Sequence, residues 1–349
     1  MSEMAHKAES SVPLLVVENL HVEFDTYGGT VQAVRGVSFS IEVGKTLAIV
    51  GESGCGKSVT VQSMMGLIPM PPGRITAGSA RLKGNEILGR HIIKGRDIRG
   101  SQIGMIFQDP MTSLNPTMTI GDQIAEPLQI HRGYSHAKAF KEAINLLSMS
   151  KIPEAAKRAR QYPFEFSGGM LQRAMIAMAI ACKPSILIAD EPTTALDVTI
   201  QAQILDLLQD LQKETGMAVI LITHDLGVVA RMADDVAVMY AGKIVEQGSV
   251  DDIFYRSAHP YTLGLKLAMP TNDPAKQHKL NPIEGSPPDL FSPPPGCGYC
   301  PRCPYAMEIC DRQQSDLIAL SGHHASRCWL HHPEVTQRPE DLTYAEGQR

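Results

Sequence analysis

The run GESGCGKS at Gly51–Ser58 constrains this chain more than any other feature of its sequence. It follows an apolar, β-prone segment, Thr46–Val50, and precedes a helix-length segment, Val59–Leu67. Glycines in such a loop let backbone N–H groups converge on phosphate oxygens, and the N-terminus of the next helix adds about half a positive charge. We therefore expect a strand, a phosphate-binding loop and a helix, with Lys57 on the β- and γ-phosphates and Ser58 on Mg²⁺.

Length, charge and hydropathy exclude several classes of protein. The chain has 349 residues and a formal net charge of −5, and it lacks a long basic run. Duplex binding rests on many Lys and Arg contacts to phosphate, so we expect no nucleic-acid partner. No apolar run approaches the roughly 18 residues of a membrane-spanning helix. Met1–Val12 also lacks the apolar region of a secretory signal. These features predict a cytoplasmic protein of two or three domains.

Two extended segments precede the phosphate loop. Leu14–Phe24 and Val31–Val43 alternate apolar and polar residues, which predicts an antiparallel β layer. Phe24 and Tyr27 in this layer are candidates to stack on an adenine ring, because an aromatic face stacks on any base. For either ring, packing beneath the hairpin is the alternative.

Polar residues also stand at the ends of three apolar, strand-like segments. They are Gln108, after residues 103–107; Asp190 and Glu191, at and after the end of residues 185–190; and His224, after residues 218–223. Open α/β sheets place their ligand-binding groups at the carboxyl ends of strands. The sequence therefore makes these four side chains candidates for ligand binding or catalysis.

Each of these polar residues has an expected role. Asp190 would join Ser58 in the Mg²⁺ site and Glu191 would activate an attacking water; a solvated acidic turn is the alternative for both acids. Gln108 would orient that water or touch Mg²⁺, unless it is a loop glutamine in solvent. His224 would contact the γ-phosphate, unless it is structural.

Helical spacing dominates residues 110–165, which predicts an inserted helical subdomain. The segment ends at Ser167-Gly168-Gly169, directly before a helical run over Leu171–Ala181. A serine and two glycines at a helix start form a second anion site. An ordinary helix cap explains these three residues equally well.

Taken together, these motifs resemble the nucleotide-binding subunit of an ATP-binding cassette (ABC) transporter. Gly51–Ser58 matches the Walker A loop and Gln108 the Q-loop. The other matches are Ser167–Gly169 with the signature motif, Ile186–Asp190 with Walker B, Glu191 with the catalytic glutamate, Ala195–Asp197 with the D-loop and His224 with the switch histidine. The signature departs from the common LSGGQ pattern at Phe166 and Met170.

The resemblance implies an α/β fold with a P-loop NTPase (RecA-like) core, an antiparallel β subdomain and the helical insertion. It implies an ABC ATPase domain over residues 14–255 and an extension over 256–349. It also implies ATP and Mg²⁺ as cofactors and a head-to-tail pair in which the signature of one subunit covers the Walker A site of the other. The residues expected to line the nucleotide are Phe24, Tyr27, Gly51, Ser53, Gly54, Cys55, Gly56, Lys57, Ser58, Val59, Gln108, Asp190, Ser167, Gly168 and Gly169.

The segment from His259 to Thr262 and the chain after it are similar to the C-terminal extension of dipeptide and oligopeptide importers. This likeness implies a second, different ATPase chain, two membrane permeases and an extracytoplasmic peptide-binding protein. The protein would then lie peripherally at the cytoplasmic face of the inner membrane. Nickel, glutathione or antimicrobial-peptide cargo, or a soluble ABC regulator without a transport role, are the alternatives.

Five cysteines crowd a loop-rich region rich in Pro and Gly, between Cys297 and Cys328, while Cys55 and Cys182 stand alone. In the cytoplasm such density favours metal binding over disulfides. Four of the five, Cys297, Cys303, Cys310 and Cys328, are similar to the ligands of a [4Fe-4S] cluster in some peptide-importer ATPases. A run that includes Cys300 is the alternative ligand set, and zinc or free or oxidised thiols are the alternatives to the cluster.

Overall fold

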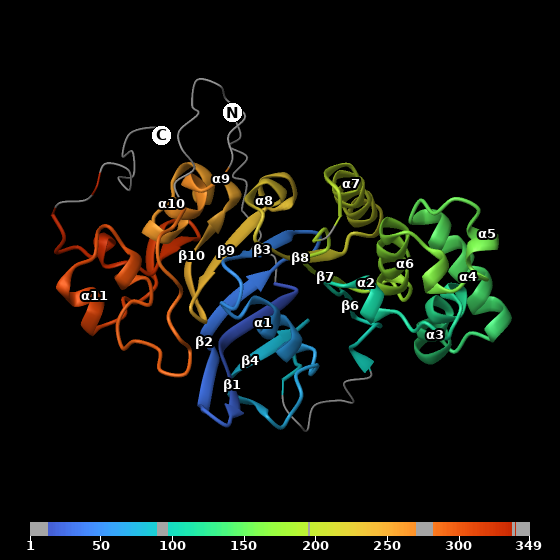
Figure 1. Cartoon of the computed structure of the whole chain (residues 1–349), viewed down its shortest axis with the longest axis horizontal. Coiled ribbons are helices and arrows are strands. Elements are labelled where there is room, and N and C mark those ends of the chain that lie inside the picture. The colour runs from blue at the N-terminus through green and yellow to red at the C-terminus, as the bar shows by residue number, and fades with distance from the viewer. Residues whose placement is uncertain (1–12, 89–96, 195, 270–281, 337–338, 340–349) are drawn as a thin grey trace, which may run out of the picture.

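The computed structural model describes residues 13–88, 97–194, 196–269, 282–336 and 339. Within them the strands form two sheets, one of four strands and one of eight. Figure 1 shows the larger sheet in the middle, a helical lobe on one side and the C-terminal residues on the other. Ala195 of the predicted D-loop lies outside the described residues.

The smaller sheet is the predicted antiparallel β layer. Its strand order is β2-β1-β4-β5, and β1 pairs antiparallel with both β2 and β4. Buried residues alternate with more exposed ones over residues 15–17 and 20–22 of β1 and over residues 37–41 of β2, as the apolar and polar alternation predicts. The strands are β1 (Leu15–Thr26), β2 (Gly29–Ile41), β4 (Gly73–Leu82) and β5 (Asn85–Glu86).

The larger sheet carries the phosphate loop. Its order is β11-β12-β10-β9-β3-β8-β7-β6, in which β9, β3, β8, β7 and β6 are parallel and β10, β12 and β11 pair antiparallel at one edge. The strands are β3 (Thr46–Val50), β6 (Ile103–Ile106), β7 (Ile186–Asp190), β8 (Ala218–Thr223), β9 (Asp235–Tyr240), β10 (Lys243–Ser249), β11 (Ile318–Ser321) and β12 (His324–Ser326).

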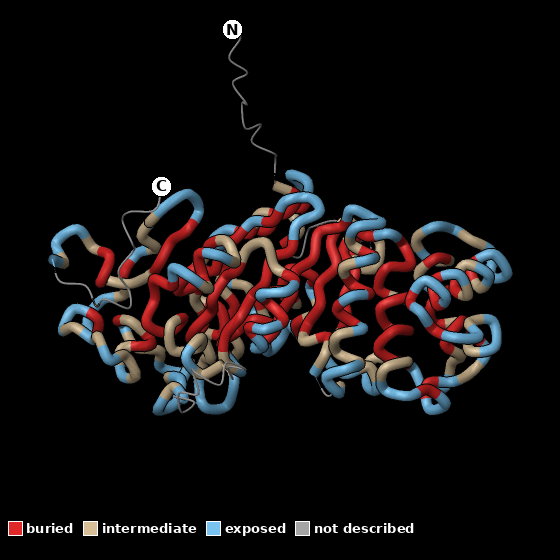
Figure 2. Tube along the Cα trace, turned by 90° about the horizontal axis from the view of Figure 1, so that it is seen from above, coloured by how far each residue is buried: buried red, intermediate tan, exposed pale blue. Residues whose placement is uncertain are grey.

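Helices cover both faces of the parallel strands. Every residue of β3, β7 and β8 is buried, which is why their sequences are continuous apolar runs. Figure 2 shows this burial concentrated in the strands and the helices beside them. The helices of this region are α1 (Lys57–Met64), α6 (Gly168–Ile180), α7 (Val198–Thr215), α8 (Leu226–Met232) and α9 (Val250–Tyr255).

Successive side chains of β7 point into two different cores. Leu187 and Ala189 pack with residues of α6, whereas Ile186 and Ile188 pack with Val61 and Met64 of α1. Helices α1 and α6 therefore cover opposite faces of the sheet, because side chains alternate along a strand.

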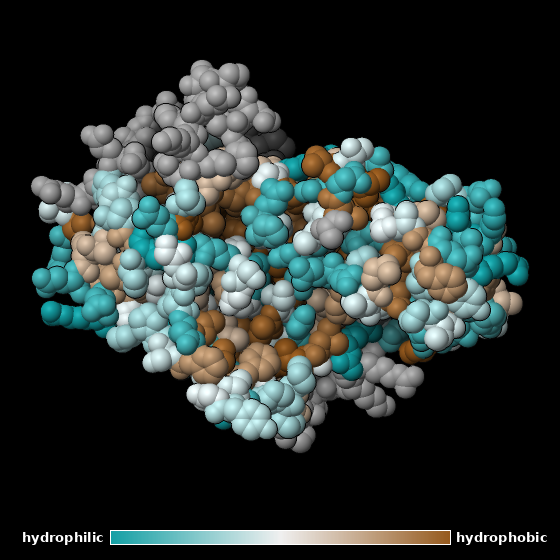
Figure 3. Space-filling model, viewed as in Figure 1, coloured by the Kyte–Doolittle hydropathy of each residue, from teal (hydrophilic) through white to brown (hydrophobic). Residues whose placement is uncertain are grey.

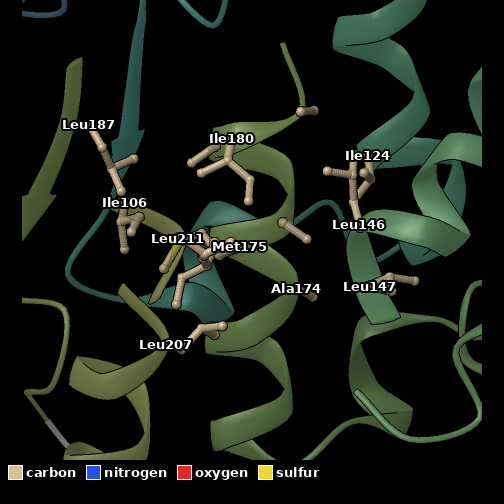
Figure 4. Close-up of a cluster of buried hydrophobic side chains, with 14 of the residues drawn as sticks. Ile106, Ile124, Leu146, Leu147, Ala174, Met175, Ile180, Leu187, Leu207 and Leu211 are labelled. Atoms are coloured by element: carbon tan, nitrogen blue, oxygen red, sulfur yellow. The ribbon is translucent and has the colours of Figure 1, made fainter. Parts of the chain in front are cut away.

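The helical lobe corresponds to the predicted insertion. Figure 4 shows α6 between this lobe and the sheet: Ile180 points towards the side of Leu187 and Met175 lies beside Leu211, while Ile124 and Leu147 come from the lobe. The lobe contains α2 (Pro110–Ser113), α3 (Ile120–Arg132), α4 (His136–Met149), α5 (Ala155–Arg158) and the 3-10 turn η2 (Pro163–Glu165). Apolar burial on both sides thus joins α6 to the lobe and to the core.

The C-terminal residues contain more secondary structure than the loop-rich region that their sequence predicts. Strand β12 pairs with β10 and so extends the central sheet. The buried ring of His324 lies 2.9 Å from Glu246 of β10, and Glu246 also accepts the backbone N–H groups of Ala258 and His259 at 2.7 and 2.8 Å. The remaining elements are α10 (Pro260–Leu267), η4 (Cys300–Arg302), α11 (Glu308–Arg312) and η5 (Trp329–His331).

In the part of the chain that the structure describes, no helix combines the length and the apolar character needed to cross a bilayer. On the face shown in Figure 3, hydrophobic residues gather mostly over the middle of the molecule, and hydrophilic residues dominate its two ends.

Candidate functional site

The phosphate loop turns between β3 and α1 as predicted. Gly51 and Gly56 have φ angles of 153° and 102°, in the region that favours glycine. A Cβ atom on Gly51 would lie 2.1 Å from the carbonyl oxygen of Met239, and one on Gly56 would lie 2.3 Å from that of Ala33. Only glycine fits at either position, since the loop presses directly against neighbouring backbone.

Lys57 begins α1 and is buried, with 5% of its surface exposed. Its Nζ donates to the carbonyl oxygens of Gly51 and Glu52, at 2.8 and 2.9 Å. The first turn of α1 contains no acidic residue that would compete for its free N–H groups. A buried cation and a helix N-terminus therefore meet at one loop, which is the arrangement that binds phosphate.

Ser58 and Asp190 come together at the carboxyl edge of the sheet. The Ser58 hydroxyl donates to Oδ1 of Asp190 at 2.9 Å. Burial raises the pKa of Asp190, against the opposing effect of the Ser58 hydrogen bond. A hydroxyl and a carboxylate are hard oxygen donors of the kind that Mg²⁺ prefers, so these residues fit the predicted metal.

Glu191 lies at the centre of a second group. Its Oε2 accepts from Nε2 of Gln108 at 3.1 Å and from the hydroxyl of Thr194 at 2.9 Å, and its Oε1 lies 3.3 Å from Nδ1 of His224. Residues that follow β6, β7 and β8 thus surround one carboxylate. Thr194 was not predicted from the sequence, although its position three residues after Glu191 places it within reach.

The backbone of Glu191 is unusual. Its φ angle is 48°, a left-handed conformation that costs a non-glycine residue about 1 kcal/mol or more. Backbone strain of this size is typical of functional residues, whose side chains must be held in one orientation. Here it accompanies a carboxylate that three other side chains surround.

The predicted second anion site is exposed. Ser167 is the N-cap residue of α6, but its side chain makes no capping hydrogen bond, contrary to a simple cap. A Cβ atom on Gly168 would meet no atom within 4 Å. Ser167–Gly169 stands at the start of α6 and the phosphate loop precedes α1, and these two helices cover opposite faces of the sheet.

The two aromatic candidates differ in exposure. Tyr27 stands at the turn between β1 and β2 and is fully exposed. Phe24 is partly buried against the core, and a Cβ on Gly73 would lie only 3.0 Å from its ring. Packing beneath the hairpin, the alternative interpretation, therefore describes Phe24 and not Tyr27.

The five clustered cysteines line one small cavity of about 20 Å³, together with Tyr299, Trp329 and other residues. All seven cysteines are free thiols, and Cys55 and Cys182 are buried elsewhere. Burial raises the pKa of the Cys303 thiol to about 12 and raises that of Cys328 further. Within the described ranges, no group of three or more His, Cys, Asp or Glu side chains is arranged to hold a metal ion. The cavity gathers the donors without forming a finished coordination site.

Two family models match the chain. The ABC transporter model covers residues 34–194, and the C-terminal region of oligopeptide/dipeptide transporters covers residues 245–310. The first match contains the loop, Gln108, Glu191 and Thr194 but not His224, and the second contains four of the five clustered cysteines.

Relatives and solved structures agree with these matches. The chain is 57% identical to the dipeptide transport ATP-binding protein DppD of Bacillus subtilis, over 91% of this chain and 94% of the relative. It is 54% identical to the oligopeptide transport ATP-binding protein OppD of the same organism, over 92% and 90%. A dimeric post-hydrolysis structure of the ATP-binding cassette MJ0796, bound to ADP and Pi, has a TM-score of 0.60 and 28% identity over 68% of this chain and 98% of that one. The chain therefore belongs to the ABC transporter family, in the branch of the dipeptide and oligopeptide transport ATP-binding proteins.

Proposed function

We propose that this chain hydrolyses ATP to power the import of dipeptides or oligopeptides across a membrane. The grouping of Gln108, His224 and Thr194 around the Glu191 carboxylate, beside the Ser58–Asp190 pair, carries the proposal. A carboxylate held in this way is suited to orient and deprotonate a water molecule. The named relatives supply the transport context and the peptide cargo.

Each residue has a role in this proposal. Lys57 and the N–H groups of residues 51–59 would bind the phosphates, and Ser58 and Asp190 would hold Mg²⁺, which would neutralise part of the negative charge of the phosphates. Glu191 accepts a proton from the attacking water, which Gln108 helps to orient. His224 would contact the γ-phosphate; its Nδ1 lies towards Glu191 and most of its side chain is exposed, which supports this role.

Tyr27 is the proposed partner of the adenine ring, and Phe24 is not. A stacking residue must present its ring face to the ligand, and Tyr27 is free to do so. Phe24 instead packs on Gly73 and the core.

Hydrolysis requires a second cassette in this proposal. Ser167 and Gly168 are exposed at the start of α6, and α6 covers the face of the sheet opposite to this chain's own α1. Its serine and helix N-terminus are therefore available to the nucleotide of a partner, in a head-to-tail pair with a second ATPase chain. The pair would act on two membrane permeases at the cytoplasmic face of the membrane, with an extracytoplasmic binding protein to deliver the peptide.

Transport by the assembled system tests the proposal. The chain is reconstituted with its second ATPase and the permeases in proteoliposomes. The peptide-binding protein is added on the side of the membrane opposite to the ATPases. A labelled oligopeptide is expected to cross to the ATPase side only when Mg-ATP is supplied there. Peptide movement that is independent of ATP, or ATP-driven movement of a metal or glutathione instead, contradicts the proposed cargo and coupling.

We also propose that Cys297, Cys303, Cys310 and Cys328 bind a [4Fe-4S] cluster. All four line the same cavity, and a thiolate site in a region of short turns gains stability from a bound metal. Burial raises the pKa of the Cys297 and Cys328 thiols because it disfavours the thiolate, and a bound metal would favour the thiolate instead.

The cluster predicts a difference between neighbouring cysteines. The full-length protein, purified without oxygen, is expected to contain about four iron atoms per chain. Cys303→Ser is expected to lose most of this iron, because a ligand is removed, whereas Cys300→Ser, which alters a surplus cysteine of the same cavity, is expected to keep it. Metal analysis of both variants checks this. Stoichiometric zinc without iron, or equal iron loss from both variants, would refute the proposed cluster or its ligand set.

A further inference from the structure

The cysteine-rich C-terminal region reaches the phosphate loop through one side chain. Arg302 lies between Cys300 and Cys303 and is almost fully buried, with a side-chain exposure of 5%. Its Nη1 donates to Oε2 of Glu52 at 2.9 Å, and Glu52 is the second residue of the loop. An ion pair therefore connects two parts of the chain that are 250 residues apart.

Arg302 is fixed in place by further hydrogen bonds. The same Nη1 lies 3.1 Å from the hydroxyl oxygen of Tyr240, Nη2 donates to the carbonyl oxygen of Ile283 at 3.0 Å, and Nε donates to that of Glu284 at 2.8 Å. Burial alone would lower the pKa of Arg302, but its hydrogen bonds to Glu52 and Tyr240 outweigh this and raise it. The guanidinium is a permanent, immobile positive charge next to the loop.

The backbone of Glu52 is also held by a residue that follows the ATPase core in the sequence. Its N–H donates to the hydroxyl of Tyr261 at 2.9 Å, and Tyr261 belongs to α10. The Tyr261 ring contacts those of Tyr240 and Tyr299, with centroid distances of 4.5 and 5.4 Å. The C-terminal region thus fixes both the main chain and the side chain of one loop residue.

The charge of Glu52 is unfavourable for the ligand that the loop is proposed to bind. A triphosphate carries several negative charges, and Lys57 already spends two hydrogen bonds on the loop carbonyls of Gly51 and Glu52. An unpaired carboxylate in the same loop would repel the phosphates, because two negative charges near a protein surface still repel each other when they are several ångströms apart. Arg302 cancels that charge.

We propose that Arg302 is a positioning residue for ATP binding, which neutralises Glu52 and so links the affinity of the phosphate loop to the docking of the cysteine-rich region. The proposal rests on the proposed function of the loop as an ATP site. It assigns Arg302 no contact with ATP: the guanidinium acts through Glu52. Cys303 follows Arg302 directly, so the turn that gathers the cysteines also sets the position of this charge.

A double-mutant cycle tests the proposal by equilibrium binding of labelled Mg-ATP to the full-length chain. Arg302→Gln is expected to weaken binding about tenfold or more, because Glu52 then faces the phosphates uncompensated. Glu52→Gln is expected to tighten binding about threefold, because the Arg302 charge is released. The double variant is expected to return to within about threefold of wild type, since both charges are gone.

Controls separate this effect from general damage. Arg231→Gln removes an arginine from a solvent-exposed ion pair with Asp206, remote in sequence from the loop, and is expected to leave ATP binding unchanged. Thermal unfolding is measured for every variant; if Arg302→Gln does not fold, Glu52→Gln decides, because tighter binding supports the proposal and unchanged or weaker binding contradicts it.

The remaining outcomes are distinct. A double variant as weak as Arg302→Gln would overturn the proposal, since charge compensation would then have no part in the effect. Failure of the wild-type chain itself to bind Mg-ATP would instead contradict the proposed function.

Discussion

Replacing Glu191 with Gln is expected to reduce ATP turnover by about a thousandfold while Mg-ATP still binds. The amide has the size of the carboxylate and can keep an oxygen towards Gln108 and Thr194, which both donate to Oε2 of Glu191. It cannot take a proton from water, so the step that Glu191 is proposed to catalyse is lost. Steady-state phosphate release by the assembled pair, together with equilibrium ATP binding, measures the two quantities separately.

Glu214→Gln is the matched control for this variant. It makes the same chemical change at an exposed residue near the end of α7, and turnover should stay at the wild-type level. Turnover of the Glu191 variant close to wild type would show that another group activates the water, and the proposed role would be withdrawn.

Gly168→Asp is expected to lower the ATP turnover of the proposed head-to-tail pair strongly without harming the chain that carries the substitution. Gly168 is the first residue of α6, and a Cβ there meets no atom within 4 Å. Aspartate in a first helical turn is mildly stabilising, because the helix N-terminus carries a partial positive charge. In a head-to-tail pair, however, the new carboxylate would face the phosphates bound by the partner.

The Gly168→Asp substitution should therefore affect the pair and not the isolated chain. The thermal midpoint and the ATP affinity of the isolated Gly168→Asp chain should match wild type, while turnover of the pair falls about a hundredfold. Asn145→Asp adds the same charge at an exposed residue of α4 and should leave all three quantities unchanged. Normal turnover of the Gly168→Asp pair would mean that Ser167–Gly169 covers no nucleotide, and the paired arrangement would be wrong.

Local sequence signals were sufficient to predict the α/β fold, the β layer and the helical lobe. The strands that carry the site, such as β3 and β7, are continuous apolar runs because both faces of the parallel sheet are covered. Gln108 and His224 stand directly after such strands, and their meeting at Glu191 follows from the parallel topology. Each of these predictions rests on a pattern within a short stretch of consecutive residues.

Contacts between distant segments were not predictable in the same way. The pairing of β12 with β10 and the ion pair between Arg302 and Glu52 depend on how the C-terminal region folds back on the core. No periodicity in the sequence encodes either contact. Phe24 shows the same limit on a smaller scale, since its partial burial depends on Gly73 in another strand.

Binding of Mg-ATP to the wild-type chain and to Lys57→Met tests most directly whether residues 51–58 bind a nucleotide triphosphate. Methionine is an unbranched side chain that fills most of the volume of the buried lysine, but it removes the charge and the hydrogen bonds that Nζ donates to the carbonyl oxygens of Gly51 and Glu52. We predict that the wild-type chain binds one Mg-ATP and that the variant binds it about a hundredfold more weakly. Equal affinity of the two proteins, or no binding by the wild type together with its partner ATPase, would contradict this account.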